Sequence, residues 1–175
     1  MTKKLLTLCF MMLTVVSMHA QSLVGKWQSK ENAVEENSKK ATILLDITDN
    51  SHLTWTRYTE VVEKEDMIMK YHVTLDGTYS QQGKKLTINL DRDNSTLTTD
   101  EITFLGEAAK MAEKSPETES FVRSLMEGQL KKSKWDIVKN IPTVSNFVIK
   151  KSSKSSLVLI DETDNTEMNF ERLTD

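Results

Sequence analysis

The segment Leu23–Ser29, with the sequence LVGKWQS, decides the fold of this chain. Gly25 lets a strand approach its neighbours closely, because glycine has no side chain. Two positions later, Trp27 supplies a large indole that fills one end of the space enclosed by this strand and its neighbours. Strand-like segments follow one another along the chain, and Phe170–Leu173 closes the series. This order predicts a mainly β domain.

The first twenty residues have the layout of a secretory signal peptide. Lys3 and Lys4 form a positively charged start, and the apolar run Leu5–Val16 follows. Ser17–Ala20 then offers a cleavage site. The apolar run is too short to span a bilayer, which needs roughly 20 residues. We therefore predict a signal peptide at 1–20 and an exported bacterial protein, periplasmic or secreted.

The remaining chain, about 155 of the 175 residues, forms one domain, 21–175, with room for a sizeable core. The only cysteine, Cys9, lies in the signal segment, so no disulfide or thiolate metal site is expected. Without the two signal lysines, 21 basic residues face 26 acidic ones, a net charge of about −5. This mildly acidic balance argues against a nucleic-acid partner, because proteins that bind nucleic acids present a basic surface. No segment after the signal is long and apolar enough to span a membrane.

Alternating apolar and polar residues predict a series of antiparallel strands. The alternation is cleanest in Lys85–Asp91. Met67–Ser80 is the longest candidate, and Gly77 within it is placed for a bulge or a barrel corner. The other candidate strands are 23–29, 41–48, 52–63, 144–151, 156–161 and 166–173. About eight strands joined mostly by short turns favour a closed barrel, which removes exposed edges.

The apolar spacing becomes helical between residues 105 and 134. Ser115–Glu117 is a helix start signal, since it combines a hydroxyl cap, a proline at the first helical position and an acid in the first turn. The sequence therefore predicts an insertion of two helices before the last three strands. The second helix carries an apolar stripe formed by Phe121, Val122, Leu125 and Met126. Such an insertion either packs on or plugs the barrel, or serves as a lid or a docking face.

The order of elements from Leu23 to Leu173 resembles a bacterial lipocalin-like domain. The resemblance rests on the Gly-x-Trp of Gly25 and Trp27 and on Arg172 late in the chain. In lipocalins the tryptophan of this motif lies across the closed end of the barrel, and an arginine stacks on it. The resemblance implies that Gly25, Trp27 and Arg172 close the barrel and have a structural role. In lipocalins the helix follows the last barrel strand, whereas here the helical segment precedes the last three strands.

An eight-stranded barrel is just wide enough to be filled by side chains or to hold one small ligand. The residues that we place near a pocket are adaptable, aromatic or polar-tipped: Trp55, Met67, Met69, Tyr71 and Phe147. The same residue types are common in protein cores. Arg57 shares a strand face with Trp55. On an inward face its guanidinium would meet an anionic group such as a carboxylate, and on an outward face it is ordinary surface.

Two functions follow from these features. The leading hypothesis is an exported, non-catalytic barrel that binds a small, largely apolar ligand. The alternative is an interaction module with a filled barrel, whose helical insertion or hairpin loops dock an envelope or surface protein. The alternative predicts that the apolar stripe of the second helix is exposed. The sequence holds no nucleophile–base pair, phosphate loop or metal-ligand cluster, so no enzyme activity, cofactor or metal is expected.

Overall fold

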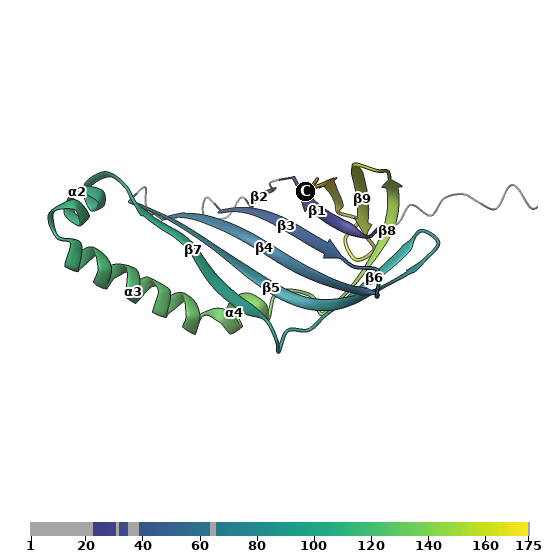
Figure 1. The fold of residues 1–175 in the computed structure, drawn as a ribbon, viewed down its shortest axis with the longest axis horizontal. Helices are drawn as coiled ribbons and strands as arrows, with labels where there is room; N and C mark the ends of the chain where they lie inside the picture. The colour runs from purple at the N-terminus through teal and green to yellow at the C-terminus, as the bar shows by residue number, and fades with distance from the viewer. Residues whose placement is uncertain (1–22, 31, 35–38, 64–65, 175) are drawn as a thin grey trace, which may run out of the picture.

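The computed structural model describes residues 23–30, 32–34, 39–63 and 66–174 (Figure 1). The predicted signal peptide, 1–20, lies outside the described residues. The strands are β1 Gly25–Ser29, β2 Asn32–Val34, β3 Lys39–Ile47, β4 His52–Glu63, β5 Met67–Gln82, β6 Lys85–Leu90, β7 Thr96–Phe104, β8 Val144–Ser152, β9 Ser156–Asp161 and β10 Glu167–Arg172. The helices are α2 Gly106–Lys114, α3 Pro116–Lys132 and α4 Lys134–Val138. None of these helices is long and apolar enough to cross a membrane.

Eight antiparallel strands close into a barrel in the order β1-β10-β9-β8-β6-β5-β4-β3, and β3 returns to β1. At the point of closure, Trp27 lies opposite Leu45 on one side and Arg172 on the other. β2 lies outside this ring and pairs with β3. The helices form an insertion before the last three strands. The predicted fold class is therefore confirmed.

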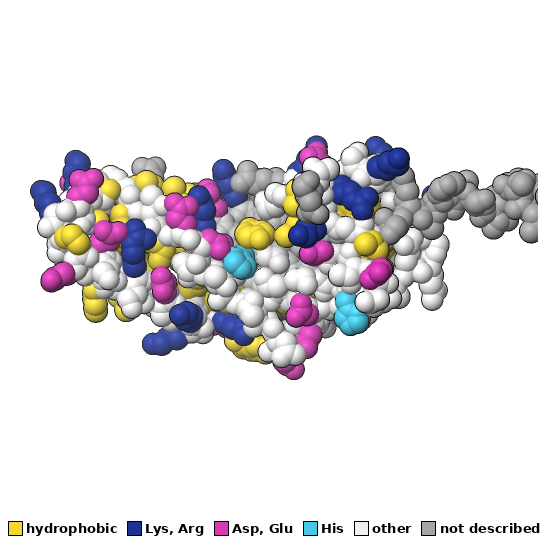
Figure 2. All heavy atoms as spheres, viewed as in Figure 1, with side chains coloured by type: hydrophobic (Ala, Val, Ile, Leu, Met, Phe, Trp, Pro, Cys, Tyr) yellow, Lys and Arg dark blue, Asp and Glu magenta, His cyan; other side chains and the backbone are white. Residues whose placement is uncertain are grey.

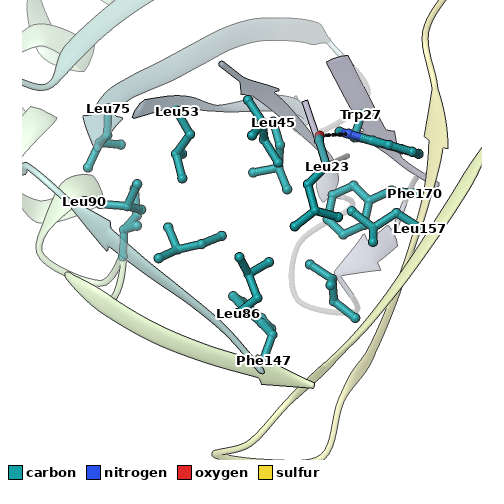
Figure 3. Packing of buried hydrophobic residues seen from close by; sticks show 14 of the residues in the cluster. Leu23, Trp27, Leu45, Leu53, Leu75, Leu86, Leu90, Phe147, Leu157 and Phe170 are labelled. Atoms are coloured by element: carbon teal, nitrogen blue, oxygen red, sulfur yellow. Dashed lines mark hydrogen bonds between the residues drawn. The ribbon is translucent and has the colours of Figure 1, made fainter. Parts of the chain in front are cut away.

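Apolar side chains fill the interior of the barrel (Figure 3). The alternation of β6 buries its second, fourth and sixth residues and leaves most of the others toward water. Leu75, Leu86 and Leu157 come from three different strands, and each is fully buried in this cluster. Val138 and Ile141, at the end of the helical insertion, join the same core. The insertion is thus anchored to the barrel at its C-terminal end.

The sheet continues beyond the barrel as an arm (Figure 1). β4 has 12 residues and β5 has 16, whereas β6, β9 and β10 have six each. The C-terminal part of β5, Gly77–Gln82, pairs with β6 inside the barrel. Its N-terminal part, Met67–Thr74, pairs with β7 outside it. The arm therefore consists of β7 and the outer parts of β3, β4 and β5, and the helices run alongside β7.

Two strands lie where the sequence predicted none. β7 occupies Thr96–Phe104, between the predicted hairpin and the helices. β2 is a three-residue strand that extends the sheet at β3. Neither strand belongs to the closed ring, so the prediction of about eight barrel strands agrees with the structure. Both widen the arm rather than the barrel.

Candidate functional site

Gly25, Trp27 and Arg172 form one contact cluster where β1 meets β10. The Trp27 side chain is 0% exposed, and its Nε1 donates a hydrogen bond of 2.7 Å to the carbonyl oxygen of Leu23 (Figure 3). The Arg172 guanidinium lies 5.1 Å from the centre of the indole and donates to the carbonyl oxygen of Val24. Gly25 has φ +134°, and a Cβ there would lie 2.5 Å from Arg172 Nη2. These side chains pack tightly where the barrel closes, and the cluster leaves no room for a ligand.

A small void of about 30 Å³ lies in the barrel interior, bordered by Trp55 and Phe147 among others. A void of this size holds about one water molecule. The two predicted site residues therefore face the core, and the core around them is filled. The void itself cannot hold a molecule larger than a water.

A larger cavity of about 190 Å³ lies where the barrel opens toward the arm. We call it the mouth cavity, and its lining residues are Ala41, Ile43, Trp55, Arg57, Asn140, Ile141 and Pro142. Ile43 and Trp55 also border the interior void, so the two spaces adjoin. The wall after α4 is held in place by Arg92, whose Nε donates to the carbonyl oxygen of Ile141 at 2.6 Å.

Among the described residues that line the mouth cavity, Arg57 is the one charged side chain. It lies on the same inward face of β4 as Trp55, opposite Ile43 on β3 and Val73 on β5. Among the described residues it has no hydrogen-bond or ion-pair partner. A half-buried charge beside apolar side chains is costly unless it is paired. The geometry therefore favours an anion in front of this guanidinium.

The other predicted site residues lie in the arm, away from the mouth cavity. Met67, Met69 and Tyr71 share the inward face of β5, where Met67 and Tyr71 are buried. Tyr71 also borders a hollow on the arm that is about 380 Å³ in volume. The structure thus brings Trp55 and Arg57 together in the mouth cavity, whereas Met67, Met69 and Tyr71 lie further along the arm and do not line it.

The second helix, α3, presents part of its predicted apolar stripe to solvent. Phe121 is 69% exposed and Leu125, one turn later, is 49% exposed. Val122 and Met126 are half-buried, and the opposite face of the helix buries Leu130. Hydrophobic side chains at this end of the molecule reach the surface among acidic and basic ones (Figure 2). An exposed apolar face of this kind marks a surface available for interaction.

The outward face of the arm carries a polar network that the sequence did not reveal. His72 Nδ1 lies 2.7 Å from Asp100 Oδ1, and its ring lies 5.3 Å from that of Tyr58. Lys70 Nζ donates to Glu101 at 2.7 Å, and this hydrogen bond raises the pKa of Lys70 and lowers the pKa of Glu101. Both acids lie on β7, which was not predicted as a strand, so no sequence signal paired them with β5. In the described part of the chain, no three His, Cys, Asp or Glu side chains are grouped to hold a metal.

No protein-family model and no curated protein sequence matches this chain. Among solved structures, the chain is similar to an uncharacterized protein from Bacteroides eggerthii DSM 20697, with 16% sequence identity. The match covers 87% of this chain and 100% of that chain, with a TM-score of 0.40. A likeness at this level carries no argument about function. The fold and the site rest on the strand pairing and the side chains described above.

Proposed function

We propose that this protein is an exported, non-catalytic barrel that binds a small molecule at the mouth cavity. The ligand places an anionic group on Arg57 and its apolar part against Trp55. The observation that carries this proposal is the unpaired guanidinium of Arg57 on the inward face of β4, in a cavity with mostly apolar walls. The signal-like pattern of 1–20 supports export.

The size of the cavity limits the ligand to a compact molecule. The volume of about 190 Å³ is below the roughly 300–1,000 Å³ of pockets that hold drug-sized ligands. The adjoining void of about 30 Å³ adds little room, so the ligand stays at the mouth of the barrel. A carboxylate matches the planar guanidinium, which donates two parallel hydrogen bonds to such a group. A short-chain carboxylic acid therefore fits both the charge and the volume.

Binding of hexanoate to the purified protein, measured by isothermal titration calorimetry, tests the proposal. Arg57→Gln removes the charge and should weaken binding by roughly 10- to 150-fold, the worth of one charged hydrogen-bonding contact. Lys154→Gln removes one exposed positive charge away from the cavity and should leave the affinity unchanged. Trp55→Phe should abolish any change of tryptophan fluorescence on binding while Trp27 and Trp135 remain.

Three results would contradict the proposal. Absence of binding across a series of carboxylates from acetate to octanoate is the first. Equal weakening by Arg57→Gln and Lys154→Gln is the second, because it would show that only the net charge matters. The third is a hexanoate-dependent fluorescence change that persists in Trp55→Phe. Thermal unfolding of each variant verifies that the barrel is still closed.

The exposed stripe of α3 supports docking of an envelope protein as a second candidate function. Two observations support it: Phe121 and Leu125 are exposed on α3, and the interior of the barrel is filled. A photocrosslinker at residue 121, in cells of the host, should give one discrete product that Leu125→Asp removes. A crosslinker at Val144, which is also exposed but lies on β8, serves as the matched control. No product, or the same product from both positions, would exclude docking through this face.

A further inference from the structure

In the described part of the chain, the strand β7 has a neighbouring strand on only one side. Among the described residues it pairs with β5 alone. The carbonyl oxygen of Ile102 accepts a hydrogen bond from the guanidinium of Arg123 on α3, so it points away from β5. The backbone of Phe104, two residues later, points to the same side by the alternation of a strand. An open edge of this kind presents N–H and C=O groups to which another extended chain can bind.

A groove runs along this edge. It has a volume of about 560 Å³, and one wall consists of the consecutive residues Thr99–Phe104. α2 and α3, which lie on the open side of β7, form the other wall (Figure 1). Its helical lining residues are Ala109, Ala112, Glu113, Glu119, Arg123 and Glu127. Six strand residues span roughly 20 Å, so the groove offers an edge long enough for a short extended peptide.

The charges in the groove select the kind of peptide. Among the described residues, five carboxylates line it against the single guanidinium of Arg123. Two of them are neutralised within the protein, Glu101 by Lys70 and Glu119 by Arg123, and Asp100 is in contact with His72 at 2.7 Å. Glu113 and Glu127, both on the helical wall, have no ion-pair partner among the described residues. A strand that enters the groove therefore meets two unpaired negative charges from the helices.

We infer that the β7 edge and the helical wall form a docking groove for an extended, lysine- or arginine-containing segment of a partner protein. The segment adds to β7 as a further strand, and its basic side chains pair with Glu113 and Glu127. In the free protein Arg123 caps the edge, since it is held by Glu119 at 2.8 Å and lies 5.2 Å from the centre of the Phe104 ring. Strand addition exchanges this one side-chain hydrogen bond for backbone hydrogen bonds. The cap limits pairing with unselected strands, a common protection of sheet edges.

Fluorescence anisotropy with a labelled peptide of alternating lysine and threonine tests this inference on the protein after signal removal. The double variant Glu113→Gln/Glu127→Gln should weaken binding about five- to tenfold, as expected for two exposed ion pairs. The matched control is Glu107→Gln/Glu117→Gln, which removes two exposed acids from the same helices outside the groove. The control should bind like the unaltered protein.

A second peptide distinguishes strand addition from a general attraction of charges. It has the same sequence but carries N-methyl groups on alternate backbone nitrogens, in both possible phases, so that it cannot pair as a strand. Both methylated peptides should bind at least tenfold more weakly. Hydrogen exchange at the Ile102 and Phe104 amides should slow when the unmethylated peptide binds.

Absence of peptide binding overturns the inference, and so does equal weakening by the two double variants. Undiminished binding of the methylated peptides shows that the groove does not add a strand. Exchange protection that falls outside β7 places the peptide elsewhere and likewise rejects the groove. Arg57→Gln leaves the groove unchanged and should not alter peptide binding, so this result is independent of the mouth cavity.

Discussion

Replacement of Arg172 by methionine tests whether the arginine over Trp27 holds the barrel closed. Methionine keeps an apolar side chain of similar length but removes the guanidinium. The stacking on the indole, seen at 5.1 Å, contributes about 0.5–2 kcal/mol. The charged hydrogen bond to the carbonyl oxygen of Val24 contributes about 1.5–3 kcal/mol. We therefore expect the free energy of unfolding to fall by about 2–5 kcal/mol, a large part of the roughly 5–15 kcal/mol typical of a domain.

A double-mutant cycle separates the two contributions. Urea unfolding followed by circular dichroism is measured for Arg172→Met, Trp27→Leu and the double variant. Only the stacking is shared by the two side chains, because the bond to Val24 depends on Arg172 alone. The coupling free energy should therefore be about 0.5–2 kcal/mol. The thermal midpoint of Arg172→Met should fall by roughly 2–4 °C for each kcal/mol lost, as expected for a chain of this size.

A coupling below about 0.3 kcal/mol would refute this reasoning, since non-interacting sites add to within that margin. The arginine would then stabilise the barrel through the Val24 carbonyl alone, and its place over the indole would contribute nothing. Lys154→Met is the control for loss of a surface charge. Its effect on the free energy of unfolding should stay within about 0.5 kcal/mol.

Three further predictions concern two glycines and the pH dependence of stability. Gly77→Ala places a Cβ 2.3 Å from the backbone oxygen of Asn89, so we expect a loss of about 1–3 kcal/mol in thermal unfolding. Gly128→Ala in α3, where an added Cβ meets no atom within 4 Å, should instead stabilise by about 0.5–1 kcal/mol. The hydrogen bond from Lys70 lowers the pKa of Glu101 from its ordinary 4.5, so its stabilising effect is complete above pH 4.5 and lost as the pH falls below that value. Lys70→Gln should reduce this acid-side dependence of the unfolding midpoint, measured between about pH 3 and 7.

Local patterns in the sequence predicted most of the elements correctly. His52–Glu63 was predicted from its composition and alternation, and β4 has the same bounds. The second helix was placed by the serine–proline–acid signal, and α3 begins at Pro116. Both signals depend on a few neighbouring residues, and neither needs to know what lies across the sheet. The closed barrel was predicted correctly because a series of antiparallel strands has few other ways to bury its edges.

β7 was missed because a bulge breaks its alternation. Leu97 and Ile102 are five residues apart, so a regular strand would place them on opposite faces. In the structure Leu97 lies opposite Val73, and Ile102 lies opposite Met69, which are only four residues apart on β5. The register shift between Lys70 and Tyr71 absorbs the extra residue and puts both apolar side chains on the inward face. No pattern within the segment could reveal this shift.

The predicted ligand-binding set was divided for a related reason. Trp55 and Tyr71 do share the inward face of the sheet, as the alternation indicated. However, Tyr71 lies opposite Thr59, four residues from Trp55 along β4, which is roughly 13 Å of strand. The barrel ends within that distance and the arm begins. Alternation predicts the face on which a side chain lies but not its position along the barrel axis. That position depends on where the partner of β5 changes from β6 to β7.

The length of β5 explains why this barrel carries an arm, helices and an open edge. β5 is longer than β6, so its outer part needs a second partner, and β7 fills that place on the same side. The inward face of this extension is apolar and lies beyond the closed ring, so it needs a cover. The helices supply it from the side of β7, and they then return the chain to the barrel for its last three strands. A single layer of helices buries only the side that faces the sheet, so Phe121 and Leu125 on the outer side stay exposed. At the β7 edge, the side chain of Arg123 donates a hydrogen bond to the carbonyl oxygen of Ile102. The exposed face of α3 and the open edge of β7 therefore both follow from the part of β5 that extends beyond the barrel.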